Sequence, residues 1–445
     1  MSSSADLTAT DTSRALPGLS RRAGFGVQVS LQVLLLAASS APTPLYSVFQ
    51  AEWGLTPITI TVVFGVYAVA VLATLLTVGK LSDHIGRRPV LLTALVLQVL
   101  ALLVFAVAGN VTDLLVARVV QGLSTGAALG ALGAGLLDFD KVKGTIANGV
   151  APITGTAVGA LISGAAVQYL PAPTKLIFVV LLAVFVLEIV AVGFMSETSA
   201  PKAGALASLR PTLALPAPIR VPMIAAVPPL SGVWALGGFY AALGPILVRQ
   251  LSGSDSFVLG GSSLFVLAGV AAVTIYLFRD LAAHRVMLLG GIALLLGVGV
   301  TLIAIATGST VGFFVGSAVA GVGFGGGFQG GLRTVLPLAQ PHERAGVLSA
   351  IYVVSYIALG VPAVIAGVII DHIGILPTAR GYAAVIMVLA ALTLAGLVVR
   401  RRAAPAAAPD MPPAPARRDL VTSVTSCEIS RSLVATRRPP ARSSW

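Results

Sequence analysis

The stretch that decides the fold of this chain is Gly79-Lys80-Leu81-Ser82-Asp83-His84-Ile85-Gly86-Arg87-Arg88-Pro89-Val90-Leu91. This short, densely charged segment separates two uninterrupted apolar runs, each with the composition of a segment that lies in lipid. Gly79 and Gly86 allow a tight turn of the backbone. Asp83 can accept hydrogen bonds from helix-terminal N–H groups, while Arg87 and Arg88 supply fixed positive charge. The pattern predicts an ordered turn between two membrane-spanning helices.

The composition of the whole chain also predicts a membrane protein. Of the 445 residues, 57% are hydrophobic and 10% are charged, and the mean hydropathy is +0.98. A soluble globule could not cover its surface with so few charges. Apolar stretches of about 20 residues, long enough to cross roughly 30 Å of hydrocarbon, recur along the chain. The predicted spans are 25–45, 58–78, 89–109, 113–137, 145–168, 175–195, 222–247, 257–278, 286–306, 311–336, 346–370 and 381–399. We therefore expect an all-α integral membrane protein with twelve transmembrane helices.

The distribution of lysine and arginine predicts how these helices are oriented. If both termini are cytoplasmic, only Lys175, Arg249 and Arg380 fall in outer loops, and most other basic residues lie on the inner side. Short cytoplasmic loops retain positive charge, whereas translocated loops avoid it. The net charge of +12 thus follows from topology and does not indicate nucleic-acid binding. We expect a multi-pass protein of the plasma membrane with both termini in the cytoplasm.

The chain divides into two halves with a tail at each end. Residues 1–24, rich in Ser, Thr and Ala, and residues 403–445, rich in Ala, Pro, Arg and Ser, are expected to be disordered cytoplasmic tails. Residues 196–221 hold several prolines and basic residues, which is typical of a linker. This linker separates two six-helix bundles, 25–195 and 222–402. Local matches between the bundles indicate a distant internal repeat.

The order of residues in 79–91 resembles the loop that joins the second and third helices of major facilitator superfamily (MFS) transporters. The resemblance implies two pseudo-symmetric six-helix bundles with a substrate site between them, and a loop that locks one conformation of an alternating-access carrier. It also implies that Asp83 docks near the start of a helix in the other half. Arg87 would pair with an acid below the fourth helix, where Asp138 and Asp140 are available. On the alternative interpretation, the loop is only a topogenic signal.

A second stretch, Arg118-Val119-Val120-Gln121-Gly122, resembles another MFS signature, in which Arg is followed three positions later by Gln-Gly. Arg118 and Gln121 share one helix face. An arginine inside a membrane helix is unfavourable unless it pairs or faces water, so it is a functional candidate. The resemblance implies a role in substrate binding or proton coupling. The alternative is that Arg118 snorkels to the outer interface.

Glycines recur every four residues in two of the predicted helices. Gly122 and Gly126 lie in the fourth helix, and Gly155 and Gly159 lie in the fifth. Such stripes let helix backbones approach one another closely, so we expect these residues to serve helix packing.

Two features bear on proton-coupled antiport. Residues 155–164 occupy the place of the signature of drug:proton antiporters, the MFS branch that this chain resembles, but Ala160 stands where that signature has a proline. Pro362 in the eleventh helix offers a comparable kink. Apart from Asp113 at the first position of its span, Glu188 is the only carboxylate inside a predicted span, which makes it a candidate proton site. The alternative is a Glu188 that is hydrogen-bonded within the bundle or snorkels to the interface.

Polar and aromatic residues of several helices are candidates to line a central cavity. Each also has an ordinary explanation, because Trp and Tyr are common interfacial anchors. A cavity with aromatic rings and amides but few acids suits amphiphilic or neutral solutes better than a polyanion. The candidates are Gln32, Tyr67, Gln121, Trp234, Tyr240, Gln329, Tyr352 and Tyr356.

Other chemistries find little support in the sequence. There is no phosphate-binding Gly-rich loop followed by Lys-Ser or Lys-Thr, which argues against an ATP-driven pump. The four histidines lack the spacing of metal ligands, and the sole cysteine, Cys427, allows no intramolecular disulfide. We expect no enzymatic activity, no metal and no cofactor, with a proton gradient as the energy source.

These observations favour a secondary active transporter that works by alternating access and functions as a monomer. Its expected activity is proton-coupled efflux of small amphiphilic compounds. Two alternatives stay open at this point. One is a proton-coupled importer or facilitator of a metabolite such as a sugar or organic acid, and the other is a transporter-like sensor that binds a ligand without moving it.

Overall fold

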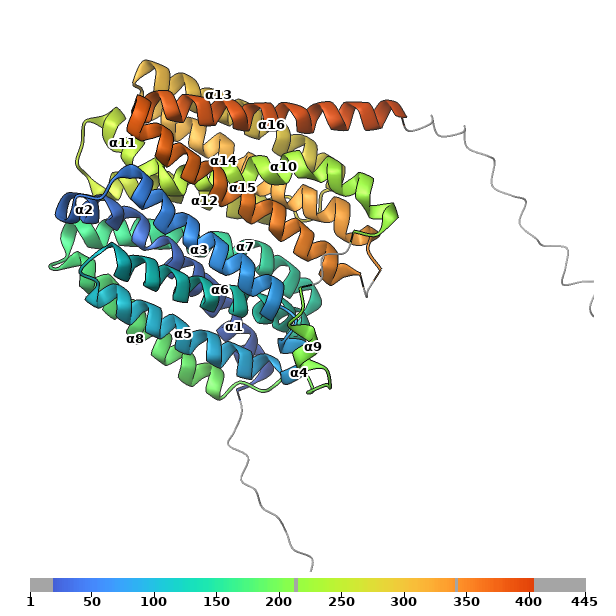
Figure 1. The fold of residues 1–445 in the computed structure, drawn as a ribbon. Helices are drawn as coiled ribbons and strands as arrows, with labels where there is room; N and C mark the ends of the chain where they lie inside the picture. The colour runs from blue at the N-terminus through green and yellow to red at the C-terminus, as the bar shows by residue number, and fades with distance from the viewer. Residues whose placement is uncertain (1–18, 212–214, 341–342, 404–445) are drawn as a thin grey trace, which may run out of the picture. The chain divides into compact units, whose positions relative to one another are not determined.

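The computed structural model describes residues 19–211, 215–340 and 343–403, and every regular element in these residues is a helix (Figure 1). Twelve helical segments are long and apolar enough to cross a membrane. The predicted all-α class with twelve spans is therefore confirmed. Of the tails predicted for 1–24 and 403–445, residues 1–18 and 404–445, including Cys427, lie outside the described residues.

The helices follow the predicted order of spans with shifted boundaries. In the first half they are α1 (Arg21–Ser40), α2 (Pro42–Trp53), α3 (Pro57–Val78), α4 (Ser82–Ile85), α5 (Arg87–Val107), α6 (Val111–Phe139), α7 (Lys141–Tyr169) and α8 (Pro173–Gly193). The linker holds α9 (Ala205–Ser208). In the second half they are α10 (Ala217–Ala242), α11 (Gly244–Ser252), α12 (Phe257–Leu277), α13 (Ala283–Thr307), α14 (Thr310–Val335), the 3-10 turn η1 (Leu336–Leu338), α15 (Arg344–Ile373) and α16 (Ile375–Ala403).

Two spans that the sequence predicted as single helices, 25–45 and 222–247, are each divided in two. The first is interrupted at Ala41, between α1 and α2, and the second at Leu243, between α10 and α11. Pro42 and Pro245 stand in the first turn of the second helix of each pair. Proline has no N–H group, so it cannot bond the carbonyl four residues earlier, and the hydrogen-bond ladder stops there.

The first helix also begins earlier than predicted. Arg21 to Gly24 belong to α1, because the Ser20 hydroxyl accepts a hydrogen bond from the N–H of Ala23 and caps the helix. We call the end of the bundle where α1 begins the terminal face, and the other end the opposite face. Under the orientation expected from the charges, the terminal face is cytoplasmic.

The two halves meet along two seams, in which α3 packs against α15 and α7 packs against α12. Small residues bring the backbones close in both. A Cβ added to Gly65 would stand 2.8 Å from Val364 Cγ2, and one added to Gly261 would stand 2.5 Å from the Ala160 carbonyl oxygen. At the opposite face, Gln168 Oε1 accepts hydrogen bonds from Ser256 Oγ (2.7 Å) and the Val258 N–H (3.2 Å). These two hydrogen bonds join the halves directly.

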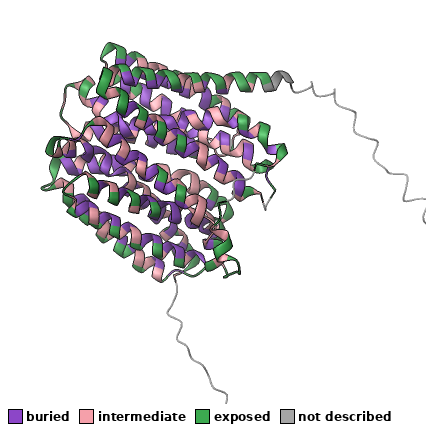
Figure 2. Cartoon of the chain, viewed as in Figure 1, coloured by how far each residue is buried: buried purple, intermediate pink, exposed green. Residues whose placement is uncertain are grey.

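The outer sides of the helices carry large apolar side chains, as lipid contact requires. Exposed residues gather on the outward surfaces in Figure 2, whereas buried ones lie between the helices. Helix α8 is the clearest case, with Leu187 69% exposed and Val190 52% exposed. A water-soluble protein does not present such a continuous apolar surface. The chain is a multi-pass membrane protein.

Candidate functional site

The loop between α3 and α5 is a compact turn that depends on its two glycines. Gly86 has φ +100°, a left-handed conformation that side chains rarely adopt, and a Cβ there would stand 2.5 Å from Glu197 Oε2. A Cβ at Gly79 would overlap the carbonyl oxygen of Leu75. The short helix α4 lies between them and carries Asp83 in its first turn.

Arg87 is the centre of a charged cluster at the terminal face. Its guanidinium donates to Asp138 Oδ2 (3.2 Å), to Ser82 Oγ (2.8 Å) and to Asp83 Oδ1, and only 8% of its side chain is exposed. Of the two acids expected near Arg87, the structure thus pairs it with Asp138. Asp140 instead caps α7 by accepting from the N–H groups of Val142 and Lys143, each at 3.0 Å.

Glu197 completes this cluster, and the sequence analysis missed it. Its carboxylate accepts hydrogen bonds from the backbone N–H groups of Arg87 (2.8 Å) and Arg88 (3.0 Å), the first residues of α5. Burial would raise the pKa of Glu197, but hydrogen bonds from the backbone N–H groups of Ser199, Arg87, Arg88 and Thr198 outweigh burial and lower it. A signal did exist, because the N–H groups that open α5 need an acceptor and Gly86 supplies no side chain.

The linker between the halves is held to the same loop. The Lys202 N–H donates to the His84 carbonyl oxygen (2.7 Å), and His84 Nδ1 lies 3.0 Å from the Ala203 carbonyl oxygen. Beside these contacts, Thr198 Oγ1 donates to Asp138 Oδ2 (3.1 Å), so Asp138 joins α6 to both α5 and the linker. The loop, α6 and the start of the linker therefore form one hydrogen-bonded unit.

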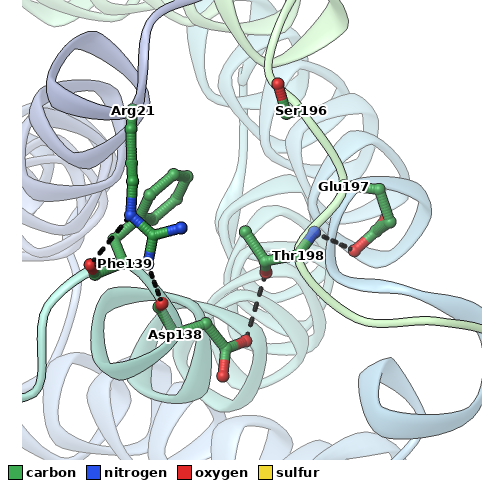
Figure 3. A pocket seen from close by; sticks show the side chains of 6 residues that line it. All are labelled: Arg21, Asp138, Phe139, Ser196, Glu197 and Thr198. Carbon is green, nitrogen blue, oxygen red and sulfur yellow. Dashed lines mark hydrogen bonds between the residues drawn. The ribbon is translucent and has the colours of Figure 1, made fainter.

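A small pocket opens beside this unit at the terminal face (Figure 3). Arg21 reaches across it from α1 and donates to the carbonyl oxygens of Asp138 (2.7 Å) and Phe139 (2.9 Å). The guanidinium thereby satisfies carbonyl groups at the end of α6, where a cation also interacts favourably with the helix dipole. The pocket has a volume of about 310 Å³ and is lined by Arg21, Asp138, Phe139, Ser196, Glu197 and Thr198.

Arg118 does not snorkel to the outer interface. It is 1% exposed, and its guanidinium donates to Tyr46 Oη (2.8 Å), to the Ser39 carbonyl oxygen (2.9 Å) and to Gln121 Oε1 (2.7 Å). It also lies over the ring of Tyr67, 5.2 Å from the centroid. Within the described part of the chain, no carboxylate forms an ion pair with Arg118.

Gln121 and Arg118 bond carbonyl groups next to the interruption between α1 and α2. Gln121 Nε2 donates to the Ala38 carbonyl oxygen (3.0 Å), which has no intrahelical partner because Pro42 lacks an N–H group. Ser163 of α7 donates to the carbonyl oxygen of Ala41, the residue at the interruption. The pair expected to act in coupling therefore has at least one definite task, which is to hold the interrupted first span.

Four of the predicted cavity residues come together where the halves meet. Tyr67 of α3 packs in one apolar cluster with Trp234 of α10 and with Tyr352 and Tyr356 of α15. The Trp234 ring lies 5.0 Å from the Tyr356 ring, measured between centroids. This cluster places aromatic surface from both halves at the same seam.

The other predicted cavity residues lie elsewhere. Gln32 donates to Asn148 Oδ1 (3.2 Å), and Gln329 donates to the Ile275 carbonyl oxygen (3.4 Å), so each binds a helix of its own half. Tyr240 is fully buried within the second half, where its hydroxyl lies 2.7 Å from Ser317 Oγ. Tyr240 thus contributes to the interior of the second half.

The glycines of the fourth and fifth spans lie at close helix contacts. A Cβ at Gly122 would stand 2.5 Å from Ala70 Cβ of α3, and one at Gly126 would stand 2.7 Å from the Val71 carbonyl oxygen. Gly155 and Gly159 lie against carbonyl groups of α1. Pro362 lies inside α15, as the sequence predicted for the eleventh span.

Glu188 is buried between α8 and α1. Its side chain is 9% exposed, and Oε1 lies 2.9 Å from the hydroxyl oxygen of Ser30 on α1. Oε2 is buried and has no hydrogen-bond partner among the described residues. The structure therefore favours the hydrogen-bonded alternative for Glu188 over snorkelling.

Comparison with known proteins identifies the family. Residues 29–311 match the Major Facilitator Superfamily, which is more than half of the chain. The chain belongs to this superfamily.

The MFS-type transporter mpsC of Macrophomina phaseolina is 32% identical over 192 residues, which are 41% of this chain and 37% of that protein. An uncharacterized transporter of Rickettsia felis is 37% identical over 84 residues, which are 18% of this chain and 20% of that protein. The matches thus span about a third and a fifth of these relatives.

Solved MFS structures share the fold over almost the whole of their length. The nucleoside transporter NupG has a TM-score of 0.66 at 14% identity, with 84% of this chain and 99% of that chain covered. A bacterial homologue of the human lysosomal transporter Spinster, inward-facing and unoccupied, has a TM-score of 0.70 at 11% identity over 86% and 98% of the two chains. The human organic anion transporter MFSD10 has a TM-score of 0.59 at 18% identity over 84% and 100%. Membership of the superfamily points to a membrane transporter rather than an enzyme.

Proposed function

We propose that this protein is a secondary active transporter that moves small amphiphilic compounds out of the cell in exchange for protons, by alternating access of a site between its halves. The proposal includes a plasma-membrane location, cytoplasmic termini and activity as a monomer. The proposal rests on membership of the Major Facilitator Superfamily and on the twelve helical segments that are long and apolar enough to cross a membrane. We extend these findings to the direction of transport, the proton coupling and the substrate class.

The observation that carries the transport proposal is the bonded unit at the terminal face. Arg87 joins α4, α5 and α6 through Asp83 and Asp138, and Glu197 joins α5 to the linker. A loop that only retained positive charge in the cytoplasm would need neither a partnered aspartate nor Gly86 in a left-handed conformation. An ordered unit that ties the linker to the loop between α3 and α5 suits a carrier in which one half moves against the other.

The substrate class follows from the seam between the halves. Tyr67, Trp234 and Tyr356 bring their aromatic rings together there. Aromatic rings bind large apolar groups, and Tyr and Trp can add one hydrogen bond each. This surface supports an amphiphilic solute.

One observation favours a second candidate, transport of an organic acid. Arg118 carries a buried positive charge that lies over the Tyr67 ring, and no described carboxylate neutralises it. A buried charge without a counter-ion is unfavourable, and an anionic substrate could supply one. The two candidates differ in the charge of the substrate.

Transport by the purified protein in vesicles tests both candidates. We would screen amphiphilic drugs, sugars and organic acids with an imposed pH gradient of either sign. The test variant is Asp83→Asn. The matched control is Asp280→Asn, which changes an exposed acid in the loop between α12 and α13 of the second half. Proton-coupled export is supported if the substrate moves against its own gradient and opposite to the proton flow, and if this movement is lost in Asp83→Asn but kept in Asp280→Asn. Co-movement of an organic acid with protons supports the second candidate, and binding without movement contradicts both.

A further inference from the structure

The contact between Ser30 and Glu188 contains more acceptors than the hydroxyl can serve. Ser30 Oγ lies 3.0 Å from the carbonyl oxygen of Val27 and 2.9 Å from Glu188 Oε1. A serine hydroxyl has one hydrogen to donate. If that hydrogen goes to Val27 and Glu188 is ionised, Ser30 Oγ and Glu188 Oε1 face each other as two acceptors with no hydrogen between them. A protonated carboxyl resolves this conflict, because Glu188 then donates to Ser30 and Ser30 donates to Val27.

The surroundings of Glu188 also disfavour an ionised carboxylate. Its second oxygen, Oε2, is buried without a partner in the described chain. Glu188 lies five residues before the end of α8 at Gly193, which places it roughly 7.5 Å from the terminal face. The other described acids within candidate spans, such as Glu52 and Asp138, lie within two residues of a span's end. A carboxylate at this depth, without a cation or a full set of donors, is costly.

Among the residues that the structure describes, no basic group is placed to neutralise Glu188. Helix α8 packs against α5, α1 and α7. The charged groups of these helices lie at their ends, and none of them forms an ion pair with Glu188 in the described chain. Arg88, which is bonded to the end of α8, donates to the Gly193 carbonyl oxygen instead. The groups concerned are Arg21 and Arg22 on α1, Arg87 and Arg88 on α5, Lys141 and Lys143 on α7, and Lys175 on α8.

We propose that Ser30 and Glu188 form a proton-binding site that senses pH at the terminal face and is separate from the transport path. Glu188 lies five residues before the end of α8, so the terminal face is the side from which a proton reaches the pair. The seams between the halves are built from α3 with α15 and α7 with α12, and α8 belongs to neither. The site therefore does not change sides when the halves move, which makes its proton a regulatory one.

Loss of this proton changes how α1 is held. An ionised Glu188 can only accept from Ser30, which then withdraws its hydrogen from Val27, and the charge draws the carboxylate toward water at the terminal face. Helix α1 carries Gln28 and Gln32 on the side away from Ser30, and Gln32 contacts Asn148 of α7. Deprotonation thus loosens one side of a helix whose other side bonds α7.

Infrared spectroscopy of the full chain in lipid vesicles tests the site without reference to transport. The C=O stretch of a protonated carboxylic acid should be present at neutral pH in the unmodified protein and lost in Glu188→Gln. It should shift in Ser30→Ala, because that change removes the acceptor, and it should persist in the control Glu52→Gln, which alters an exposed acid at the opposite face. If no band disappears in Glu188→Gln, or if the band does not shift in Ser30→Ala, the proposal is overturned.

Hydrogen exchange measured by mass spectrometry tests the consequence. After correction for the intrinsic rate, peptides from 21–40 and 173–193 should exchange faster at alkaline than at neutral pH in the unmodified protein. Glu188→Gln, which is permanently neutral, should remove this difference, whereas Glu52→Gln should keep it. Equal exchange at both pH values in the unmodified protein would contradict the sensing role, even if the transport proposal holds.

Discussion

Gln121 of α6 donates a 3.0 Å hydrogen bond to the carbonyl oxygen of Ala38, the carbonyl that Pro42 cannot bond. Gln121, which belongs to the second MFS signature, therefore supplies a hydrogen bond that the backbone of the first span lacks. Arg118 bonds the neighbouring carbonyl of Ser39 at 2.9 Å. The interruption in the first span and the polar residues of the fourth form one structural unit.

This unit predicts that Gln121→Leu destabilises the protein. The change leaves the Ala38 carbonyl without a donor and removes an acceptor of Arg118. Unsatisfied buried groups cost about 1–3 kcal/mol, so the apparent melting temperature in detergent should fall. An unchanged melting temperature would show that water or another group satisfies Ala38 equally well.

Gln98→Leu is the matched change with the opposite expectation. Gln98 is fully buried in α5, and neither atom of its side-chain amide has a hydrogen-bond partner in the described chain. Replacing it with an apolar side chain of similar size removes two buried polar groups and no bond. The melting temperature should stay the same or rise. A clear fall would reveal a partner, such as a bound water, that the amide serves.

Gly155→Ala should disrupt packing between α7 and α1. A Cβ at this position would overlap the carbonyl oxygen of Val33, which is backbone and cannot move aside alone. Overpacking of this kind costs about 1–3 kcal/mol. Gly26→Ala on α1 is the control, since nothing lies within 4 Å of its Cβ and alanine favours a helix over glycine. Thermal unfolding of both variants tests this expectation. If Gly155→Ala is as stable as Gly26→Ala, the close contact is contradicted.

The lowered pKa of Glu197 predicts how stability depends on acid. A carboxylate whose pKa is lower in the folded protein stabilises it above the ordinary value of 4.5, and this contribution is lost as pH falls through the lowered pKa. Between neutral pH and 4.5 the contribution of Glu197 should therefore stay constant. Melting temperatures of the unmodified protein and Glu197→Gln should differ at neutral pH and converge in stronger acid. A constant difference at every pH would exclude ionisation as the cause.

Gln168→Ala should weaken the closure of the halves at the opposite face. Gln168 accepts two hydrogen bonds from the start of α12 in the other half. Spin labels on Tyr169 and Asp255, in a Cys427→Ser background, would report the distance between the halves by electron resonance. The variant should show a larger population of long distances. As a control, Gln50→Ala changes an amide on α2 that makes no such contact.

Much of the fold could be predicted from local sequence. Apolar length indicates the spans, and Gly79 with Gly86 indicates a tight turn after α3. The glycines at 122, 126, 155 and 159 were expected at helix contacts, and they lie there because only a missing side chain permits backbone contact. The interruptions at Ala41 and Leu243 were missed, although Pro42 and Pro245 carried the signal.

What each segment is can be predicted from local sequence, because hydropathy, turn residues and loop charge act over a few neighbouring positions. The tertiary structure determines which groups meet. It paired Arg87 with Asp138 rather than Asp140, and it brought Glu197, which is 110 positions away, to the start of α5. It also brought Ser30 of α1 to Glu188 of α8. Such hydrogen bonds depend on how helices distant in the chain pack in three dimensions, and no local pattern records that packing.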